Sequence, residues 1–149
     1  MKPHALFLTA MIFLLGFSVM AQEGSPRTAL MKQEASGPES ITILWSSGNP
    51  DVFDNIIWPY FHYSCEQRCW KDMTLFVWGN AVRQIAEHEA WQDKLALLIS
   101  KGLKVKACRL SSEQCHATDL LKTMGVELGY IEQELTRELK GRTAQLLTL

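Results

Sequence analysis

One cysteine occupies a position where a parallel sheet would present a reactive side chain. Cys108 ends the alternating run 102–108, a pattern that predicts a short strand followed by a polar turn. Open α/β sheets hold their ligands outside the carboxyl ends of the strands. Arg109 follows directly, and a nearby positive charge favours the thiolate, the form of cysteine that attacks sulfur or binds metal. Cys108 and Arg109 are therefore the candidate catalytic residues.

Disulfide formation is the first alternative for the cysteines, which are Cys65, Cys69, Cys108 and Cys115. In an oxidising compartment an even number of cysteines defaults to disulfides. Cys108 would then pair with Cys115, or it would be a small buried apolar residue. On an ideal helix Cys65 and Cys69 would have Cβ atoms about 5–6 Å apart, whereas a disulfide needs about 3.5–4.5 Å. A bridge between them requires non-helical backbone, and pairing with Cys108 or Cys115 is the alternative.

A metal site is the second alternative use of these sulfurs. His62, Cys65 and Cys69 are spaced i, i+3, i+7 and would share one helix face. Cys115 and His116 could complete a set of nitrogen and sulfur ligands. The spacing matches no strong zinc signature, so we expect no metal and no cofactor, and keep a Cys/His metal-binding protein as an alternative function.

Small polar residues follow the first two predicted strands. Ser46, Ser47, Gly48 and Asn49 come after one strand, and Gly79 with Asn80 after the next. Their backbone N–H groups could bind a small ligand or an anion beside Cys108. The alternative is that they are turn and cap residues with local roles.

Familiar catalytic signatures are missing from the sequence. It contains no G-x-S-x-G, P-loop, G-x-G-x-x-G, H-E-x-x-H or C-x-x-C motif. The last absence argues against a thioredoxin-type oxidoreductase. Whether the protein is an enzyme stays open at this stage.

The elements that must position these residues alternate between strands and helices. Strands are predicted at 41–45, 73–78, 102–108, 126–130 and 145–149, with helical periodicity between them. Asp51 is a candidate helix cap, Pro59 is expected to kink or end that helix, and a bend is expected near His88. Such alternation predicts an α/β fold with a mostly parallel sheet covered on both faces.

The N-terminal segment resembles an export signal. Residues 1–21 combine a basic start, a short apolar run and the small residue Ala21, which predicts a cleaved signal peptide. Residues 22–40 are predicted to be a flexible tether, and 41–149 one domain. We expect a periplasmic or secreted protein without a membrane anchor after cleavage. Removing Lys2 leaves 14 basic and 16 acidic residues, a net charge of −2, which does not suggest nucleic-acid binding.

Several short segments, taken in order, resemble the DsrE/DsrF-like family of sulfur-relay proteins. They are residues 45–50, 74–79, 102–108, 125–127, 135–136 and 146–149, so the resemblance spans about 41–149. It implies a three-layer α/β/α sandwich with a five-stranded parallel sheet, assembly into trimers or hexamers, and a persulfide on the residue that corresponds to Cys108. The sequence departs from the family at Ser111, where related sequences often have a second cysteine, and in having Cys65 and Cys69.

These observations predict an exported thiol or persulfide sulfur carrier that acts through Cys108, with a sulfur donor or acceptor protein as partner. The alternative from another class is a non-catalytic, disulfide-stabilised binding or assembly module.

Overall fold

Five parallel strands form one sheet in the structure, a computed structural model that describes residues 39–141 and 144–149. The strands are β1 (Ser40–Trp45), β2 (Asp72–Val77), β3 (Lys104–Cys108), β4 (Glu127–Gly129) and β5 (Ala144–Thr148). Their order in the sheet is β4-β3-β2-β1-β5, and every neighbouring pair is parallel. The predicted fold class is confirmed. The predicted signal peptide and all but the last two residues of the predicted tether lie outside the described residues.

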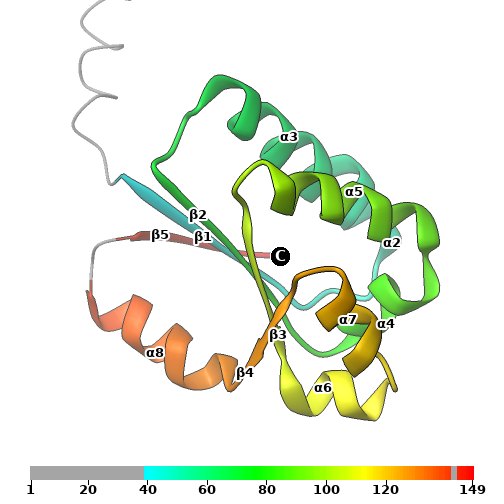
Figure 1. Ribbon diagram of the computed structural model, residues 1–149. Coiled ribbons are helices and arrows are strands. Elements are labelled where there is room, and N and C mark those ends of the chain that lie inside the picture. The colour runs from blue at the N-terminus through cyan, green and yellow to red at the C-terminus, as the bar shows by residue number, and fades with distance from the viewer. Residues whose placement is uncertain (1–38, 142–143) are drawn as a thin grey trace, which may run out of the picture. The chain divides into compact units, whose positions relative to one another are not determined.

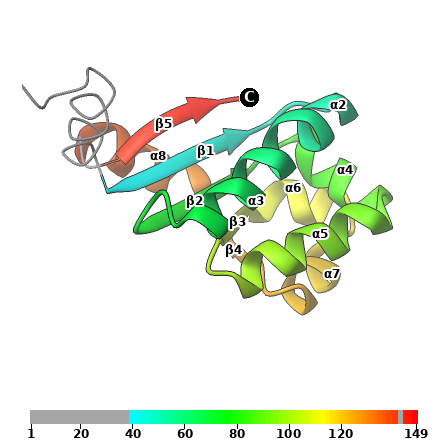
Figure 2. The same cartoon turned by 90° about the horizontal axis from the view of Figure 1, so that it is seen from above.

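Helices cover both faces of this sheet. They are α2 (Pro50–Val52), the π-helix η1 (Phe53–Ile57), α3 (Trp58–Gln67), α4 (Asn80–Glu87), α5 (Glu89–Ser100), α6 (Arg109–Gln114), α7 (Thr118–Thr123) and α8 (Ile131–Gly141). The helices α3 and α5 lie on one face and α8 on the other (Figures 1 and 2). From β1 to β4 the sheet grows in one direction, whereas α8 returns the chain to β5, next to β1. Right-handed crossovers require that such a return cross the opposite face.

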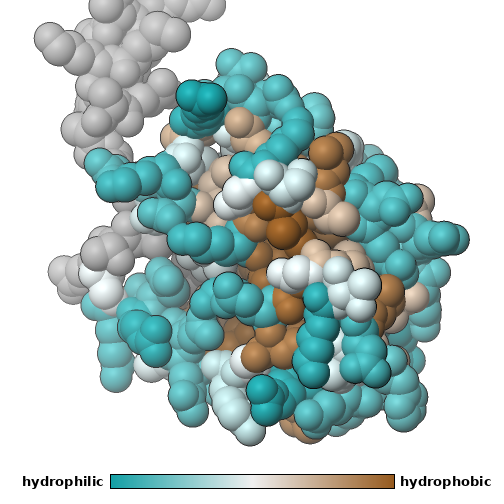
Figure 3. Space-filling model, in the orientation of Figure 1, coloured by the Kyte–Doolittle hydropathy of each residue, from teal (hydrophilic) through white to brown (hydrophobic). Residues whose placement is uncertain are grey.

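The period-2 alternation of the strands divides the core into two parts. Ile43, Leu75 and Val105 face α3, α5 and α7, and they belong to the larger buried cluster. Leu44 and Phe76 face α8 and belong to a smaller cluster. Apolar side chains are visible in the middle of the molecule around β3 and β4, and hydrophilic side chains surround them (Figure 3).

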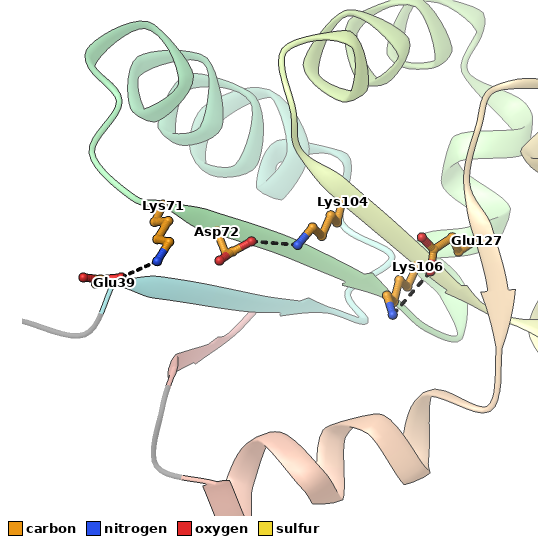
Figure 4. Close-up of polar contacts among 6 residues, drawn as sticks. All are labelled: Glu39, Lys71, Asp72, Lys104, Lys106 and Glu127. Carbon is orange, nitrogen blue, oxygen red and sulfur yellow. Dashed lines mark hydrogen bonds and ion pairs between the residues drawn. The ribbon is translucent and has the colours of Figure 1, made fainter.

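Charged residues tie the amino-terminal half of the sheet together. Lys104 Nζ lies 2.7 Å from Asp72 Oδ1, and Lys106 Nζ lies 3.3 Å from Glu127 Oε2 (Figure 4). Lys106 also donates to Glu134 of α8. These pairs join β2, β3, β4 and α8, and they leave the carboxyl-terminal ends of the strands for other contacts.

Pro59 explains the wide helical turn that precedes it. Trp58 N–H donates to the Phe53 carbonyl five residues back, which is the bond of a π-helix. Pro59 has no N–H to donate and its ring would crowd the carbonyl four residues back. A π-turn at this place moves the chain around the ring, so the expected distortion at Pro59 is confirmed.

Three local features differ from the sequence-based expectations or refine them. Asn49, and not Asp51, caps the first helix, since its Oδ1 accepts from the Asp51 N–H. The stretch after Cys108 is the helix α6 and not a polar turn. The expected bend separates α4 from α5 at His88, which has extended backbone. No helix among the described residues is long and apolar enough to cross a membrane.

Candidate functional site

Cys108 is the last residue of β3, as predicted, but its side chain belongs to the core. It is 5 % exposed and lies in the smaller buried cluster with Leu44, Phe76 and Ile131. Ile131 begins α8, so this helix covers the end of β3 on that face. The expectation of an accessible sulfur at the rim of the sheet is therefore wrong. Alternation within β3 is the reason, since it turns Cys108 toward the face that α8 covers.

Arg109 is exposed at the start of α6. Its guanidinium carbon lies 5.8 Å from the centre of the Tyr130 ring, within the range of a cation–π contact. Tyr130 follows Gly129, which is paired with Cys108 in the sheet. The backbone carbonyl of Cys108 accepts a hydrogen bond of 2.8 Å from Ser112 Oγ, which ties the end of β3 to α6.

The four cysteines are all free thiols. Cys108 and Cys115 flank α6, and a rise of 1.5 Å per residue separates their Cα atoms by about 10 Å. This separation exceeds the reach of a disulfide. Cys65 and Cys115 pack against the larger cluster, whereas Cys108 belongs to the smaller one.

The segment that holds Cys65 and Cys69 does leave helical geometry between them. Arg68 has a φ of 52° and ends α3, and Cys69 N–H bonds back to the Ser64 carbonyl. Burial raises the pKa of the Cys65 thiol, with a smaller opposing effect of Lys101. Cys69 is exposed.

The residues of the alternative metal site do not assemble. No group of three or more His, Cys, Asp or Glu side chains is placed to hold a metal ion in the described part of the chain. His62 instead packs against Trp58, with ring centres 4.9 Å apart. Cys115 and His116 follow α6, and His116 has a φ of 53°, so this pair forms the turn into α7. The structure thus gives no support to a site made of His62, Cys65, Cys69, Cys115 and His116.

Two side chains of the predicted ligand-binding loop form hydrogen bonds within the loop and at the start of α2. Ser47 Oγ accepts from the Asn49 N–H at 3.1 Å, and Asn49 caps α2. Ser46 N–H donates to the Leu149 carbonyl, which holds the start of the loop against the end of β5. The local roles that the sequence analysis left open are therefore present for these residues.

The loop nonetheless meets the turn after β2. A Cβ built on Gly48 would lie 3.1 Å from Asn80 Cβ, so the two segments approach as closely as a bare Cα allows. Gly79 has φ 61° and ψ −127°, a conformation open to glycine. Its N–H donates to Ser111 Oγ at 3.2 Å. The ends of β1, β2 and β3 are thus joined through these residues.

The sheet changes its direction of growth next to this meeting point, between β1 and β5. The strands that follow β1 are added on one side of it, whereas β5 lies on its other side. Open α/β sheets bind ligands at such a switch point, outside the carboxyl ends of the strands. The loop 46–49 leaves β1 at this place.

A buried polar atom belongs to the residue that precedes this loop. Trp45 is the last residue of β1 and is fully buried. Its Nε1 finds no hydrogen-bond partner among the described residues. The Trp45 ring packs against Phe53 and Trp91, with ring centres 5.4 and 6.0 Å apart. Buried donors without a partner are rare in native proteins and call for a water, ion or ligand.

An acidic group at the rim of this aromatic cluster escaped the sequence analysis. Asp54 accepts hydrogen bonds from Lys94 Nζ at 2.7 Å and Trp91 Nε1 at 3.2 Å. The bond from Lys94 is the main cause that lowers the pKa of Asp54, and the bond from Trp91 adds to it. Ser111 also went unrecognised as the partner of Gly79. No spacing signal connects such distant positions, because only the topology brings them together.

Comparison with known proteins adds support for the fold. No family model matches the sequence, and no curated protein matches it. A solved structure of a conserved protein of unknown function from Bacteroides thetaiotaomicron, BT1422, is similar to this chain. The two share 24 % identity at a TM-score of 0.71, over 74 % of this chain and 95 % of that one. At this identity the likeness shows the fold alone, and membership of the DsrE/DsrF-like family stays a prediction.

Proposed function

We propose that this protein is a non-catalytic binding module that takes a small polar ligand at the carboxyl ends of β1 and β2. The observation that carries the proposal is the close approach of Gly48 to Asn80 at the carboxyl ends of β1 and β2, beside the point between β1 and β5 where the sheet changes its direction of growth. Glycine at both 48 and 79 lets the backbone of two loops come near the same place.

The residues at the carboxyl ends of β1 and β2 suit a polar ligand. Ser46, Gly48, Asn49 and Asn80 are exposed, and they offer hydroxyl, amide and backbone groups.

The burial of Cys108 is the reason to prefer binding over thiol chemistry. Reactive cysteines are partly exposed and lie in a positive environment, whereas buried cysteines in apolar surroundings are inert. Cys108 contributes its sulfur to an apolar cluster, where it acts as a small hydrophobic side chain. A disulfide-stabilised form of the module is not needed, since both cores close without one.

The test is a map of backbone amide signals by NMR during titration with a set of small carboxylates, phosphates and amides. We expect at least one compound to shift the amides of Gly48, Gly79 and Asn80. The Gly48→Val variant, in which a side chain intrudes on Asn80, should weaken that compound tenfold or more. The control Gly129→Ala should bind as before, since its added Cβ makes only an ordinary contact with Glu134. Shifts confined to other surfaces, or none, contradict the proposal.

Sulfur transfer through Cys108 is a second candidate function, favoured by the position of this residue at the carboxyl end of β3. The Cys108 thiolate would attack the outer sulfur of a donor persulfide, forming a new S–S bond while the donor leaves as a thiolate. This step requires Ile131 and Leu135 to move away from the sulfur.

A persulfide donor separates the two candidates. Transfer predicts a gain of one sulfur on Cys108 in the folded protein, and its loss in Cys108→Ser. The binding module predicts that Cys108 stays unmodified until the protein is unfolded.

A further inference from the structure

The two edges of the sheet differ in how they resist strand addition. β4 has three residues, and its Glu127 is ion-paired with Lys106. Short length and charge are the usual means by which proteins prevent another strand from pairing with an edge. The opposite edge, β5, has five residues, Ala144–Thr148, with no charged residue, glycine or proline.

The backbone of β5 is bonded on one side. Leu149 N–H donates to the Leu44 carbonyl, and the Leu149 carbonyl accepts from the Ser46 N–H. Successive residues of a strand direct their backbone N–H and C=O groups to opposite sides. The backbone groups of Leu147 and Gln145 therefore also face β1. Ala144, Leu146 and Thr148 then direct their N–H and C=O groups to the outer edge. No described helix or strand lies outside β5 (Figure 2).

We propose that β5 pairs with β5 of a second copy of this chain, in antiparallel orientation about a two-fold axis, and so joins two sheets into one. The absence of charge makes the strand compatible with itself, since an antiparallel pair of identical strands places no like charges opposite each other. If Leu146 pairs with Leu146 of the second copy, the outward backbone groups of Ala144 pair with those of Thr148 in the second copy. Every outward backbone group of the strand is then bonded. Leu147, 45 % exposed, gains cover at this edge.

A second copy fits this edge better than an unrelated strand. A two-fold contact uses one surface twice and closes on itself, so it leaves no further β5 edge exposed. The inference concerns the outer side of β5, whereas the proposed ligand site lies at the carboxyl ends of β1 and β2. It does not depend on that site. It predicts a dimer, whereas the family resemblance predicts trimers or hexamers.

The experiment measures molar mass by sedimentation across a range of protein concentrations. It uses the mature chain as recovered from the cells that produce it. Thr148→Pro removes an outward N–H and leaves the bonds to β1, whereas Thr148→Val keeps that N–H. Leu147→Lys places a charge at the edge, and Leu139→Lys makes the same change on an exposed position of α8.

We expect a dimer that Thr148→Pro and Leu147→Lys convert to folded monomers, with a dissociation constant raised tenfold or more. Thr148→Val and Leu139→Lys should remain dimers. A wild-type monomer at all concentrations, a trimer, or a dimer that persists in Leu147→Lys overturns the inference. Should Thr148→Pro unfold, as judged by circular dichroism, Leu147→Lys alone decides.

Discussion

Ile131, the first residue of α8, lies in the same buried cluster as Cys108, the last residue of β3. The thiol is therefore part of the packing between the sheet and the helix that returns the chain to β5. This packing removes the access that a sulfur nucleophile needs.

Replacing this sulfur with a hydroxyl should destabilise the fold. Cys108→Ser places a polar group in an apolar cluster, and we expect a loss of about 1–3 kcal/mol in the free energy of unfolding. Cys69→Ser, at an exposed position, should stay within about 0.5 kcal/mol of the wild type. Urea unfolding followed by tryptophan fluorescence measures both values. Equal stability of the two variants would contradict the burial of Cys108.

The ion pair between Asp54 and Lys94 should make stability depend on pH in the acid range. Because the pKa of Asp54 is lowered on folding, its contribution is complete above the unfolded value near 4 and is lost as the pH falls through the folded-state pKa. Asp54 is half exposed, so Asp54→Asn should cost no more than about 1 kcal/mol at pH 7.

Urea midpoints of wild type and Asp54→Asn, measured from pH 7 down to pH 2, test this expectation. The two curves should converge at the acid end. Asp93→Asn, an exposed position on α5, serves as the control and should follow the wild type throughout. A constant gap between Asp54→Asn and wild type at every pH would show that the pair is not responsible.

The backbone conformation of Gly79 should tolerate no side chain. Gly79→Ala forces a residue with a Cβ into φ 61° and ψ −127°, and we expect a loss of about 1–3 kcal/mol in unfolding free energy. Gly129→Ala is the matched control, because Gly129 has no positive φ and its Cβ would make an ordinary contact. Thermal or urea unfolding compares the two variants, and equal stability would show that the backbone of Gly79 is not strained by a side chain.

Export predicts a shorter mature protein. If residues 1–21 are a cleaved signal, the chain recovered from cells should begin at Gln22. Intact-mass spectrometry and N-terminal sequencing read this directly, in separated periplasmic, secreted and cytoplasmic fractions. A chain that keeps residues 1–21 in the cytoplasmic fraction would refute both the signal and the predicted compartment.

The sequence predicted the fold well because strands and helices leave strong local signals. The alternation in 41–45 and 102–108 and the apolar run in 73–78 identified three strands, and each lies within two residues of its predicted bounds. Pro59 and His88 marked real distortions of the backbone. Pro59 has no N–H to donate, and the helical phase of the apolar residues changes near His88.

The site was less predictable because its properties depend on tertiary contacts. Strand periodicity could place Cys108 at the end of β3, but it could not show that α8 would cover that face. The bond from Gly79 to Ser111 joins residues of different crossovers, and the contact of Gly48 with Asn80 needs the sheet order. The residue types of Ser47 and Asn49 fit both ligand binding and capping, and only the hydrogen bonds show their capping and turn roles.

The amide titration with small carboxylates, phosphates and amides separates ligand binding at β1 and β2 from chemistry at Cys108 when it is run on wild type and Cys108→Ala side by side. A binding module should show the same ligand-induced shifts at Gly48, Gly79 and Asn80 in both proteins, because binding does not use the sulfur. Shifts that centre on β3 and α8 and vanish in Cys108→Ala would contradict the binding module, and would restore Cys108 as the functional residue.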